Sequence, residues 1–384
     1  MRSSDKVVTV VRMSEGRTGR SAPHVPILDG WRGLAIASLL VGHFAPLPGV
    51  NFGRMGVELF FVLSGRLMAE ILFVRRFPIP AFFRRRIARV WPALFVFVIF
   101  IAVQAAILGA SGTPRSLDDE LYYLKAITWF DVLTALTFTA NYVSAFGHRV
   151  FALDHIWSLC IEEHTYVVLA IVAWIARRRH ANPALICFVA AICVMLDGLL
   201  QSVILHHYYS EVYWRTDTRA SSILLPAALC LMLRQNNYFG GRLPDVTPLF
   251  FGFAGVILSA GMVLDSIKYT LGTICFAISV CTLEVAPAFI RRILCHPVMV
   301  TLGLWSFSLY LWQQPFRVMR GQLPAPFLLA GAFVCALASF YVVERPARRF
   351  LNRYWGTAES RKGAAATAAA AQDRFPASLP PPAE

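Results

Sequence analysis

Three ionisable residues lie within the first strongly apolar stretch of the chain, where such residues are costly and usually mark function. Arg32 and His43 are 11 positions apart. On an α-helix this spacing puts them within about 20° of each other around the axis and about 16 Å apart along it. Asp29 stands three positions before Arg32, where it can pair with the guanidinium. A simpler interpretation is an arginine that extends to the membrane surface and a histidine whose ring nitrogens are hydrogen-bonded within the protein. However, an imidazole that titrates near neutral pH is suited to proton transfer.

Arginines are concentrated in one short segment. Residues 75–89 contain six of them, including Arg85, Arg86 and Arg89. One interpretation is a cytoplasmic loop that only orients the protein in the membrane, although this cluster exceeds what orientation requires. Because guanidinium forks match phosphate oxygens, the alternative is a polyphosphorylated ligand on the cytoplasmic side.

Carboxylates in apolar surroundings are the third group of candidate functional residues. Glu58 lies with Ser64 in a second apolar run, and Glu162 and Glu163 are adjacent near the expected external end of a later one. A further polar group consists of Arg215, Asp217 and Arg219. Its alternating charges could simply pair with one another. The gathering of several such groups at one membrane face nevertheless predicts a polar cavity.

The composition indicates that lipid surrounds these residues. Of the 384 residues, 57% are hydrophobic and 15% are charged, and the mean hydropathy is +0.58. Soluble domains have about 45–50% apolar and about 25% charged residues, so a soluble enzyme, a disordered chain and a coiled-coil rod are excluded. Basic cytoplasmic loops explain the net charge of +14, and we therefore expect no nucleic-acid binding.

Ten runs are long and apolar enough to cross a bilayer, which needs about 20 residues per helix. They are 27–48, 54–74, 90–110, 156–176, 184–205, 220–234, 247–265, 270–290, 298–318 and 324–344. The Thr-rich stretch 129–146 is interrupted by Asp131 and Asn141 and is either an eleventh span or an external segment. Leaving it external puts most basic residues in the cytoplasm. The predicted fold is an all-α polytopic membrane protein, with about ten transmembrane helices around a polar cavity and both termini cytoplasmic.

The ends of the chain differ from this membrane domain, which we place at 27–350. The segment 1–26 has no apolar core of its own, so we expect it to be cytoplasmic and without a cleaved signal peptide. The tail 351–384 is rich in Ala and Pro and is expected to be disordered and cytoplasmic. The 8 cysteines lack metal-ligand spacing, and no metal site is predicted.

Seven segments occur in an order typical of one enzyme family. They are LDGWRGLAIASLLVGHF (28–44), GVELFFVLSG (56–65), FRRRIARVWP (83–92), WSLCIEEHTY (157–166), RTDTR (215–219), LGLWSFSLYLWQQPF (302–316) and ERPARR (344–349). Together they resemble the acyltransferase-3 family of integral membrane O-acyltransferases, whose first helix carries an Arg-x10-His signature, here Arg32 and His43. This sequence has Glu58 where the family usually has Asp, His164 where Gln is common and Gln313 where His is frequent.

The resemblance implies an enzyme that transfers an acyl group, usually acetyl from acetyl-CoA, to a hydroxyl group of a carbohydrate or related acceptor. It also implies a multi-pass location in the bacterial inner membrane. No cofactor is expected to be bound permanently, and acyl-CoA is expected as a co-substrate. Family members acylate O-antigen, exopolysaccharide, peptidoglycan, nodulation oligosaccharides and macrolide sugars, so the acceptor stays open.

Acyl transfer to an alcohol needs a base, a stabilised oxyanion and two positioned reactants. We expect His43 to act either as the base for the acceptor hydroxyl or as a transient acyl carrier. Arg86 and Arg89, supported by Arg85, are expected to bind the CoA phosphates at the cytoplasmic face.

The other polar residues receive positioning roles. Arg32, oriented by Asp29, is expected to hold the pantetheine arm or the thioester oxygen. Glu162 and Glu163 would orient His43 or the incoming sugar from the outer side. The remaining supporting residues are Glu58, Arg215, Asp217 and Arg219.

Two other classes of protein use similar residues. A secondary transporter or flippase for a sugar or lipid intermediate also carries Arg, His and Glu inside the membrane. Such proteins often have inverted repeats, and we find none between the two halves of this sequence. A non-catalytic scaffold would tolerate substitution of Arg32 and His43.

Overall fold

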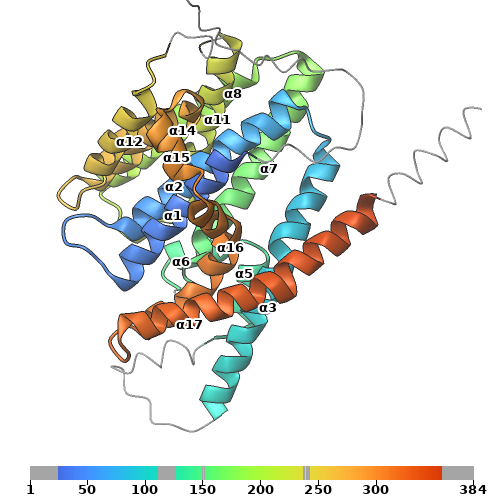
Figure 1. The fold of residues 1–384 in the computed structure, drawn as a ribbon, viewed down its shortest axis with the longest axis vertical. Coiled ribbons are helices and arrows are strands. Elements are labelled where there is room, and N and C mark those ends of the chain that lie inside the picture. The colour runs from blue at the N-terminus through green and yellow to red at the C-terminus, as the bar shows by residue number, and fades with distance from the viewer. Residues whose placement is uncertain are drawn as a thin grey trace, which may run out of the picture.

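The chain is helical throughout the part that the computed structural model describes, which is residues 25–110, 127–148, 150, 152–236, 238 and 243–356. Apart from two isolated β-bridges, every regular element in these residues is a helix, which confirms the all-α prediction (Figure 1). The α-helices are α1 (Pro26–Phe44), α2 (Phe52–Met68), α3 (Ile79–Ala110), α5 (Trp129–Leu136), α6 (Ala140–Ala145), α7 (Ile156–Arg179), α8 (Pro183–Leu199), α9 (Tyr209–Tyr213), α10 (Thr216–Arg219), α11 (Ser221–Gln235), α12 (Thr247–Leu258), α13 (Asp265–Ile267), α14 (Thr273–Cys281), α15 (Ala288–Leu294), α16 (Pro297–Val318) and α17 (Ala325–Ala338). Wider π-helical turns adjoin some of them at η1 (Ala69–Val74), η2 (Leu200–Ile204), η3 (Lys268–Gly272) and η5 (Ser339–Glu344), and η4 (Leu283–Val285) is a 3₁₀ turn.

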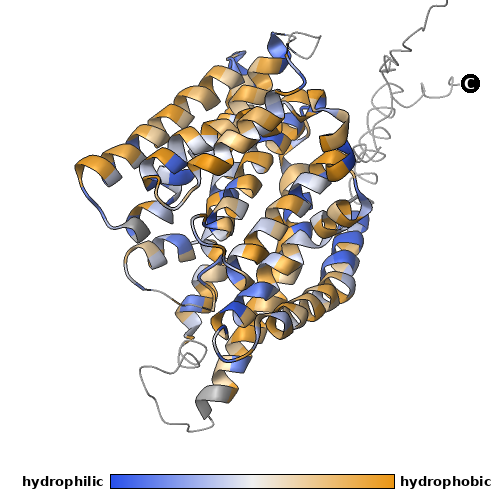
Figure 2. Cartoon of the chain, turned by 60° about the vertical axis from the view of Figure 1, so that its left-hand side comes forward, coloured by the Kyte–Doolittle hydropathy of each residue, from blue (hydrophilic) through white to orange (hydrophobic). Residues whose placement is uncertain are grey.

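Among the described residues, four helices are long and apolar enough to cross a membrane: Ile79–Ile107, Ile156–Arg179, Pro183–Ile204 and Ala325–Gly356. α15 and α16 together form a fifth candidate, bent by 49°. Only 22% of the apolar window of Pro183–Ile204 and 28% of that of Ala325–Gly356 are buried in the protein. Hydrophobic residues cover much of the outer helices of the molecule (Figure 2), and apolar surfaces of this extent mark contact with lipid. The chain is therefore a membrane protein.

Each of the ten predicted runs contains a helix, but several of these helices differ in length from a span. α3 begins at Ile79 rather than at residue 90, because the arginines of the basic segment favour helix and form its first turns. α12 has only 12 residues and α14 has 9, which is shorter than the roughly 20 residues of a span. The number of ten spans therefore stays a prediction.

The stretch 129–146 does not form one continuous helix. It folds into α5 and α6, which are joined by a turn with positive φ at Phe138. The 8 residues of α5 rise only about 12 Å, well short of the bilayer core. Neither α5 nor α6 alone is long enough to span a bilayer, and the external placement of the stretch stays a prediction.

Close packing of α1 on α16 positions the first of the predicted site residues. A Cβ atom added to Gly33 would lie 2.0 Å from the carbonyl oxygen of Met299, and one added to Gly303 would lie 1.9 Å from that of Asp29. Only glycine allows backbones to approach this closely. The two helices therefore lie backbone to backbone, and Arg32 reaches a cavity that α16 also lines.

Candidate active site

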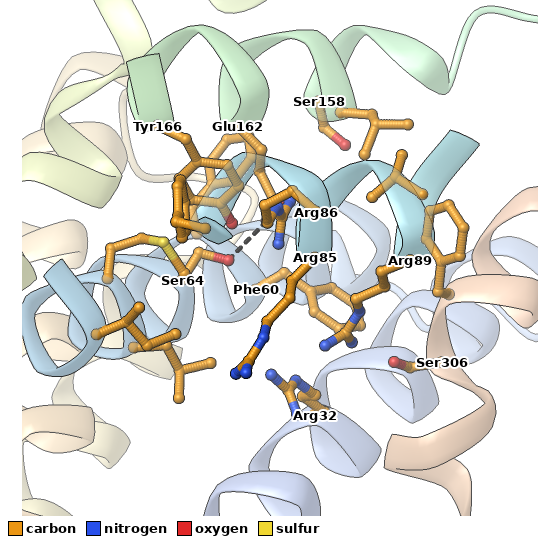
Figure 3. A pocket seen from close by; sticks show the side chains of 18 of the residues that line it. Arg32, Phe60, Ser64, Arg85, Arg86, Arg89, Ser158, Glu162, Tyr166 and Ser306 are labelled. Carbon is orange, nitrogen blue, oxygen red and sulfur yellow. Dashed lines mark hydrogen bonds and ion pairs between the residues drawn. The ribbon is translucent and has the colours of Figure 1, made fainter. Parts of the chain in front are cut away.

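A cavity of about 350 Å³ lies between α1, α2, η1, the first turns of α3, α7 and α16. Apolar side chains form most of its wall, and polar side chains enter from several of these helices (Figure 3). Five of the lining residues were predicted from the sequence as site residues: Arg32, Arg85, Arg86, Arg89 and Glu162. The structure thus brings together residues that lie up to 130 positions apart in the chain (from 32 to 162).

The cavity extends along the helices. Phe77 lines it close to the turn between η1 and α3, whereas Ser158 lines it at the first turn of α7 and Tyr310 on α16. Arg177, near the other end of α7, donates hydrogen bonds to the carbonyl oxygens of Leu72 and Phe77. Phe77 and Ser158 therefore mark opposite ends of the cavity.

Three guanidinium groups converge on the cavity (Figure 3). Arg85 and Arg89 are four positions apart on α3 and share one helix face, and Arg32 approaches them from α1. The Arg32 Nη1 atom lies 2.5 Å from Asp29 Oδ1, as the spacing predicts, and the Arg85 guanidinium lies 4.4 Å from the centre of the Phe77 ring. Like charges repel strongly away from bulk water. These three cations outnumber the two nearby carboxylates, Asp29 beside Arg32 and the buried Glu344, whose charge acts on Arg89, so the site is suited to an anion.

Arg86 belongs to a second polar group in the cavity wall. Its Nη2 atom lies 2.6 Å from Glu163 Oε1 and 3.7 Å from Glu162 Oε2, and its guanidinium lies 4.1 Å from the centre of the Tyr166 ring. Ser64 donates a hydrogen bond of 2.7 Å to Glu162 (Figure 3). From the sequence, the two glutamates were expected to orient His43 or the incoming sugar, and Arg86 was expected to bind the CoA phosphates. The structure instead brings Arg86 and the two glutamates together.

His43 lies beyond the cavity, at the last turn of α1. Its Nδ1 atom is 2.6 Å from Gln313 Oε1 on α16. On α2, a Cβ atom added to Gly53 would lie 3.0 Å from His43 Nε2, so the imidazole fits between α2 and α16. Arg32 lines the cavity whereas His43 does not, and the prediction that both residues line one cavity is not met in this structure.

Glu58 and Arg219 form a buried ion pair away from the cavity. Arg219 Nη2 lies 2.5 Å from Glu58 Oε2, and Thr273 donates a 2.5 Å hydrogen bond to the other carboxylate oxygen. The Arg219 guanidinium also lies 3.8 Å from the centre of the Tyr269 ring. These contacts join α2 to α10, η3 and α14, so the pair serves packing.

Arg215 and Asp217 form an ion pair with each other, the simpler of the two interpretations that the sequence allowed. Arg215 also donates a 2.6 Å hydrogen bond to Gln201, and the Tyr142 hydroxyl donates one of 3.1 Å to Asp217. Burial, together with the Asp217 carboxylate, raises the pKa of Tyr142. The group connects α6, η2 and α10 and lies outside the cavity lining.

Comparison with known proteins identifies the chain. A family model described as an acyltransferase domain matches residues 25–344, which include every helix that lines the cavity. The chain belongs to the acyltransferase-3 family. This confirms the resemblance drawn from the seven segments and the prediction of an acyltransferase enzyme.

Two relatives of the acyltransferase-3 domain carry names that describe an acceptor. The chain is 26% identical to the peptidoglycan O-acetyltransferase OatA of Listeria monocytogenes, over 88% of this chain and 59% of that protein. It is 25% identical to the protein of Bacillus subtilis named putative peptidoglycan O-acetyltransferase YrhL, over 85% of this chain and 55% of that protein. The chain thus spans less than two thirds of the length of these relatives. No solved structure gives a significant match to it.

Several residues of the acyltransferase-3 cavity were not predicted from the sequence. Ser158, Tyr166, Ser306 and Tyr310 all line it. They are uncharged and stand within apolar runs, so hydropathy does not separate them from packing residues. Their spacing was the available signal, because Ser158, Glu162 and Tyr166 recur every four positions, as do Ser306 and Tyr310, and such residues share a helix face.

Proposed function

We propose that this protein is a membrane O-acyltransferase that moves an acyl group, most simply acetyl, from acyl-CoA to a hydroxyl group of a carbohydrate of the cell envelope or of an exported product. The observation that carries the proposal is the convergence of Arg32, Arg85 and Arg89 on a largely apolar cavity. The names of the two relatives support an acetyl group and a peptidoglycan-type acceptor.

The cavity matches two chemical parts of acyl-CoA, the phosphates and the pantetheine arm. The phosphates would lie against Arg32, Arg85 and Arg89, whose guanidinium forks bind phosphate oxygens bidentately. The uncharged pantetheine arm would lie along the apolar wall. Relative to the assignment made from the sequence, Arg32 takes the place of Arg86. Arg32 pairs with one carboxylate, Asp29, and its guanidinium converges with those of Arg85 and Arg89, whereas the Arg86 guanidinium faces both Glu162 and Glu163.

The orientation of Gln313 supports a base role for His43. Gln313 Nε2 donates to the carbonyl oxygen of Tyr310 at 3.3 Å, which turns Oε1 toward the imidazole. Since Oε1 can only accept, the hydrogen-bond network assigns the ring proton to His43 Nδ1 and leaves Nε2 to accept a proton.

In the proposed transfer, His43 Nε2 takes the proton of the acceptor hydroxyl and the acceptor oxygen attacks the thioester carbonyl. The carbon–sulfur bond breaks, and the proton passes to the departing thiolate, giving the ester and CoA. A histidine that carries the acyl group itself would use the same nitrogen as nucleophile and is the alternative route.

The proposed setting is the bacterial inner membrane, with ten spans, both termini cytoplasmic and residues 27–350 as one membrane domain. The basic residues near the Phe77 end of the cavity favour a cytoplasmic opening there, the side on which CoA is available. Most of the proposed terminal segments, 1–26 and 351–384, lies outside the described residues.

The test is transfer of label from radiolabelled acetyl-CoA into alkali-labile esters of envelope carbohydrate, in membranes that contain the full chain. We expect transfer by the wild-type protein, none by His43→Ala and wild-type transfer by Tyr341→Phe, a change at a position 49% exposed outside the cavity. Mass analysis of glycans from cells with and without the gene would identify the acceptor. A transporter or flippase predicts no labelled ester, and that result would overturn the proposal.

A further inference from the structure

We propose that Tyr310 closes the end of the cavity opposite Phe77 and thereby restricts the transferred acyl group to short chains such as acetyl and propionyl. This inference rests on the proposed function, since it takes the cavity to hold an acyl-CoA donor. It adds a residue that selects the acyl group.

The order of residues along α16 places Tyr310 at a boundary. Ser306 and Tyr310 line the cavity, whereas Gln313, about one helical turn further, contacts His43 instead. On α7, Ser158 is the lining residue closest to the start of the helix, and it contacts Tyr310. Tyr310 thus lies where the cavity ends and the His43–Gln313 pair begins, and its carbonyl oxygen accepts a hydrogen bond from Gln313.

Hydrogen bonds to Ser158 on α7 and to His155, the residue immediately before that helix, hold the Tyr310 ring in this position. Its hydroxyl donates to the carbonyl oxygen of His155, and its oxygen lies 2.8 Å from Ser158 Oγ. The ring centre is 5.1 Å from that of His155, and the residue is buried. A ring that is fixed by two neighbours at the start of the facing helix forms a rigid end wall rather than a mobile side chain.

The orientation in which acyl-CoA would bind places the end of its acyl chain against the Tyr310 ring, so the ring would limit the length of that chain. With its phosphates against Arg32, Arg85 and Arg89, an extended acyl-CoA would point its thioester toward Tyr310, next to His43. An acetyl group adds one methyl carbon beyond the carbonyl, whereas a longer chain would meet the ring. Once the ring is removed, each additional buried methylene contributes about fourfold in affinity.

The experiment measures the dissociation constants of acetyl-CoA, butyryl-CoA and free CoA with the purified full chain in the absence of an acceptor. We expect the wild-type protein to prefer acetyl-CoA. Tyr310→Ala should shift the ratio of butyryl-CoA to acetyl-CoA affinity roughly 15-fold toward butyryl-CoA, as two buried methylenes predict, and Tyr310→Leu should shift it in the same direction by roughly fourfold, as one methylene predicts. Tyr310→Phe retains the ring and should retain the wild-type preference. Tyr341→Ala, at an exposed tyrosine outside the cavity, is the matched control.

The outcomes separate this inference from the proposed function. If the wild-type protein binds acetyl-CoA but the Ala and Leu variants keep its chain-length preference, Tyr310 is not the end wall. If the variants bind all three ligands more weakly by the same factor, Tyr310 has a purely structural role, and this result would also overturn the inference. Tyr310→Leu keeps most of the apolar volume, so the test stands even where the Ala variant does not fold. Failure of the wild-type protein to bind any acyl-CoA would instead overturn the donor assignment.

Discussion

The Nδ1 atom of His43 lies 2.6 Å from the Oε1 atom of Gln313, although 270 positions separate the two residues in the chain. This contact ties the end of α1 to α16 and fixes which imidazole nitrogen carries the proton. In the sequence, Gln313 stood out only as a departure from the family pattern. In the structure it is the residue that orients the proposed base.

Substitution at this pair should separate chemistry from binding. His43→Ala should lower the rate of acyl transfer at least about 100-fold, the usual contribution of a general base. Gln313→Leu should lower kcat by a smaller factor, because the imidazole remains but its tautomer is no longer fixed. Both variants should bind acetyl-CoA as tightly as the wild-type protein. Steady-state rates and equilibrium binding on the same preparations check this, and appreciable transfer by His43→Ala would remove it from the base role.

Arg86 and Arg89 should respond differently although they are three positions apart. Arg86→Met leaves Glu163 without its partner inside the protein, which typically costs about 3–5 kcal/mol. Arg89→Met should instead weaken acetyl-CoA binding with little loss of stability. Thermal unfolding in detergent and ligand binding on both variants measure the two effects.

The control for this comparison is Arg75→Met. Arg75 pairs with Glu70 at 2.9 Å but is 35% exposed, so loss of that pair should cost less than about 1 kcal/mol. Equal destabilisation by Arg75→Met and Arg86→Met would contradict the assignment of Arg86 to a buried structural pair.

The Glu58–Arg219 pair should govern stability. Glu58→Ala leaves a buried guanidinium without its carboxylate, and we expect a loss of about 3–5 kcal/mol in unfolding free energy. Glu58→Asp keeps the charge and should cost less. Protein that stays folded should bind acetyl-CoA normally, since the pair lies outside the cavity lining. A stable Glu58→Ala protein that fails to bind acetyl-CoA would show that this group belongs to the site.

Gly303→Ala should disturb the site through packing. The new methyl group would lie 1.9 Å from the carbonyl oxygen of Asp29, so α1 and α16 must separate and Arg32 must move away from Arg89. We expect weaker acetyl-CoA binding and a lower melting temperature. Gly272→Ala is the matched control, because its methyl group would meet only Leu258 Cβ at an ordinary 3.8 Å. Similar losses in the two variants would argue against a specific effect of the α1–α16 contact.

Local spacing in the sequence predicted the contacts that occur within one helix. The pairing of Asp29 with Arg32 followed from their separation of three positions. The sequence could not show how closely, and with which faces, two helices pack against each other. Arg86 and Glu163 were both singled out, but their contact depends on how α3 and α7 pack.

The extent of the cavity was beyond sequence analysis for a similar reason. A separation of 11 residues places Arg32 and His43 on one face of a helix. It does not show which side chains of other helices lie between them. Tyr310 lies within an apolar run and carries no charge, so hydropathy treats it as a packing residue. Its position at the end of the cavity follows from the contact of α16 with α7.

The central claim is that Arg32, Arg85 and Arg89 bind the phosphates of acyl-CoA. The most direct measurement compares the affinities of acetyl-CoA and acetyl-pantetheine, which lacks the phosphates and the adenosine, for the purified wild-type protein and Arg89→Ala. We predict that the wild-type protein prefers acetyl-CoA and that Arg89→Ala reduces this preference by roughly 10- to 100-fold, the usual strength of hydrogen bonds to charged groups. An unchanged preference in Arg89→Ala, or equal affinity of the wild-type protein for both ligands, would contradict the account.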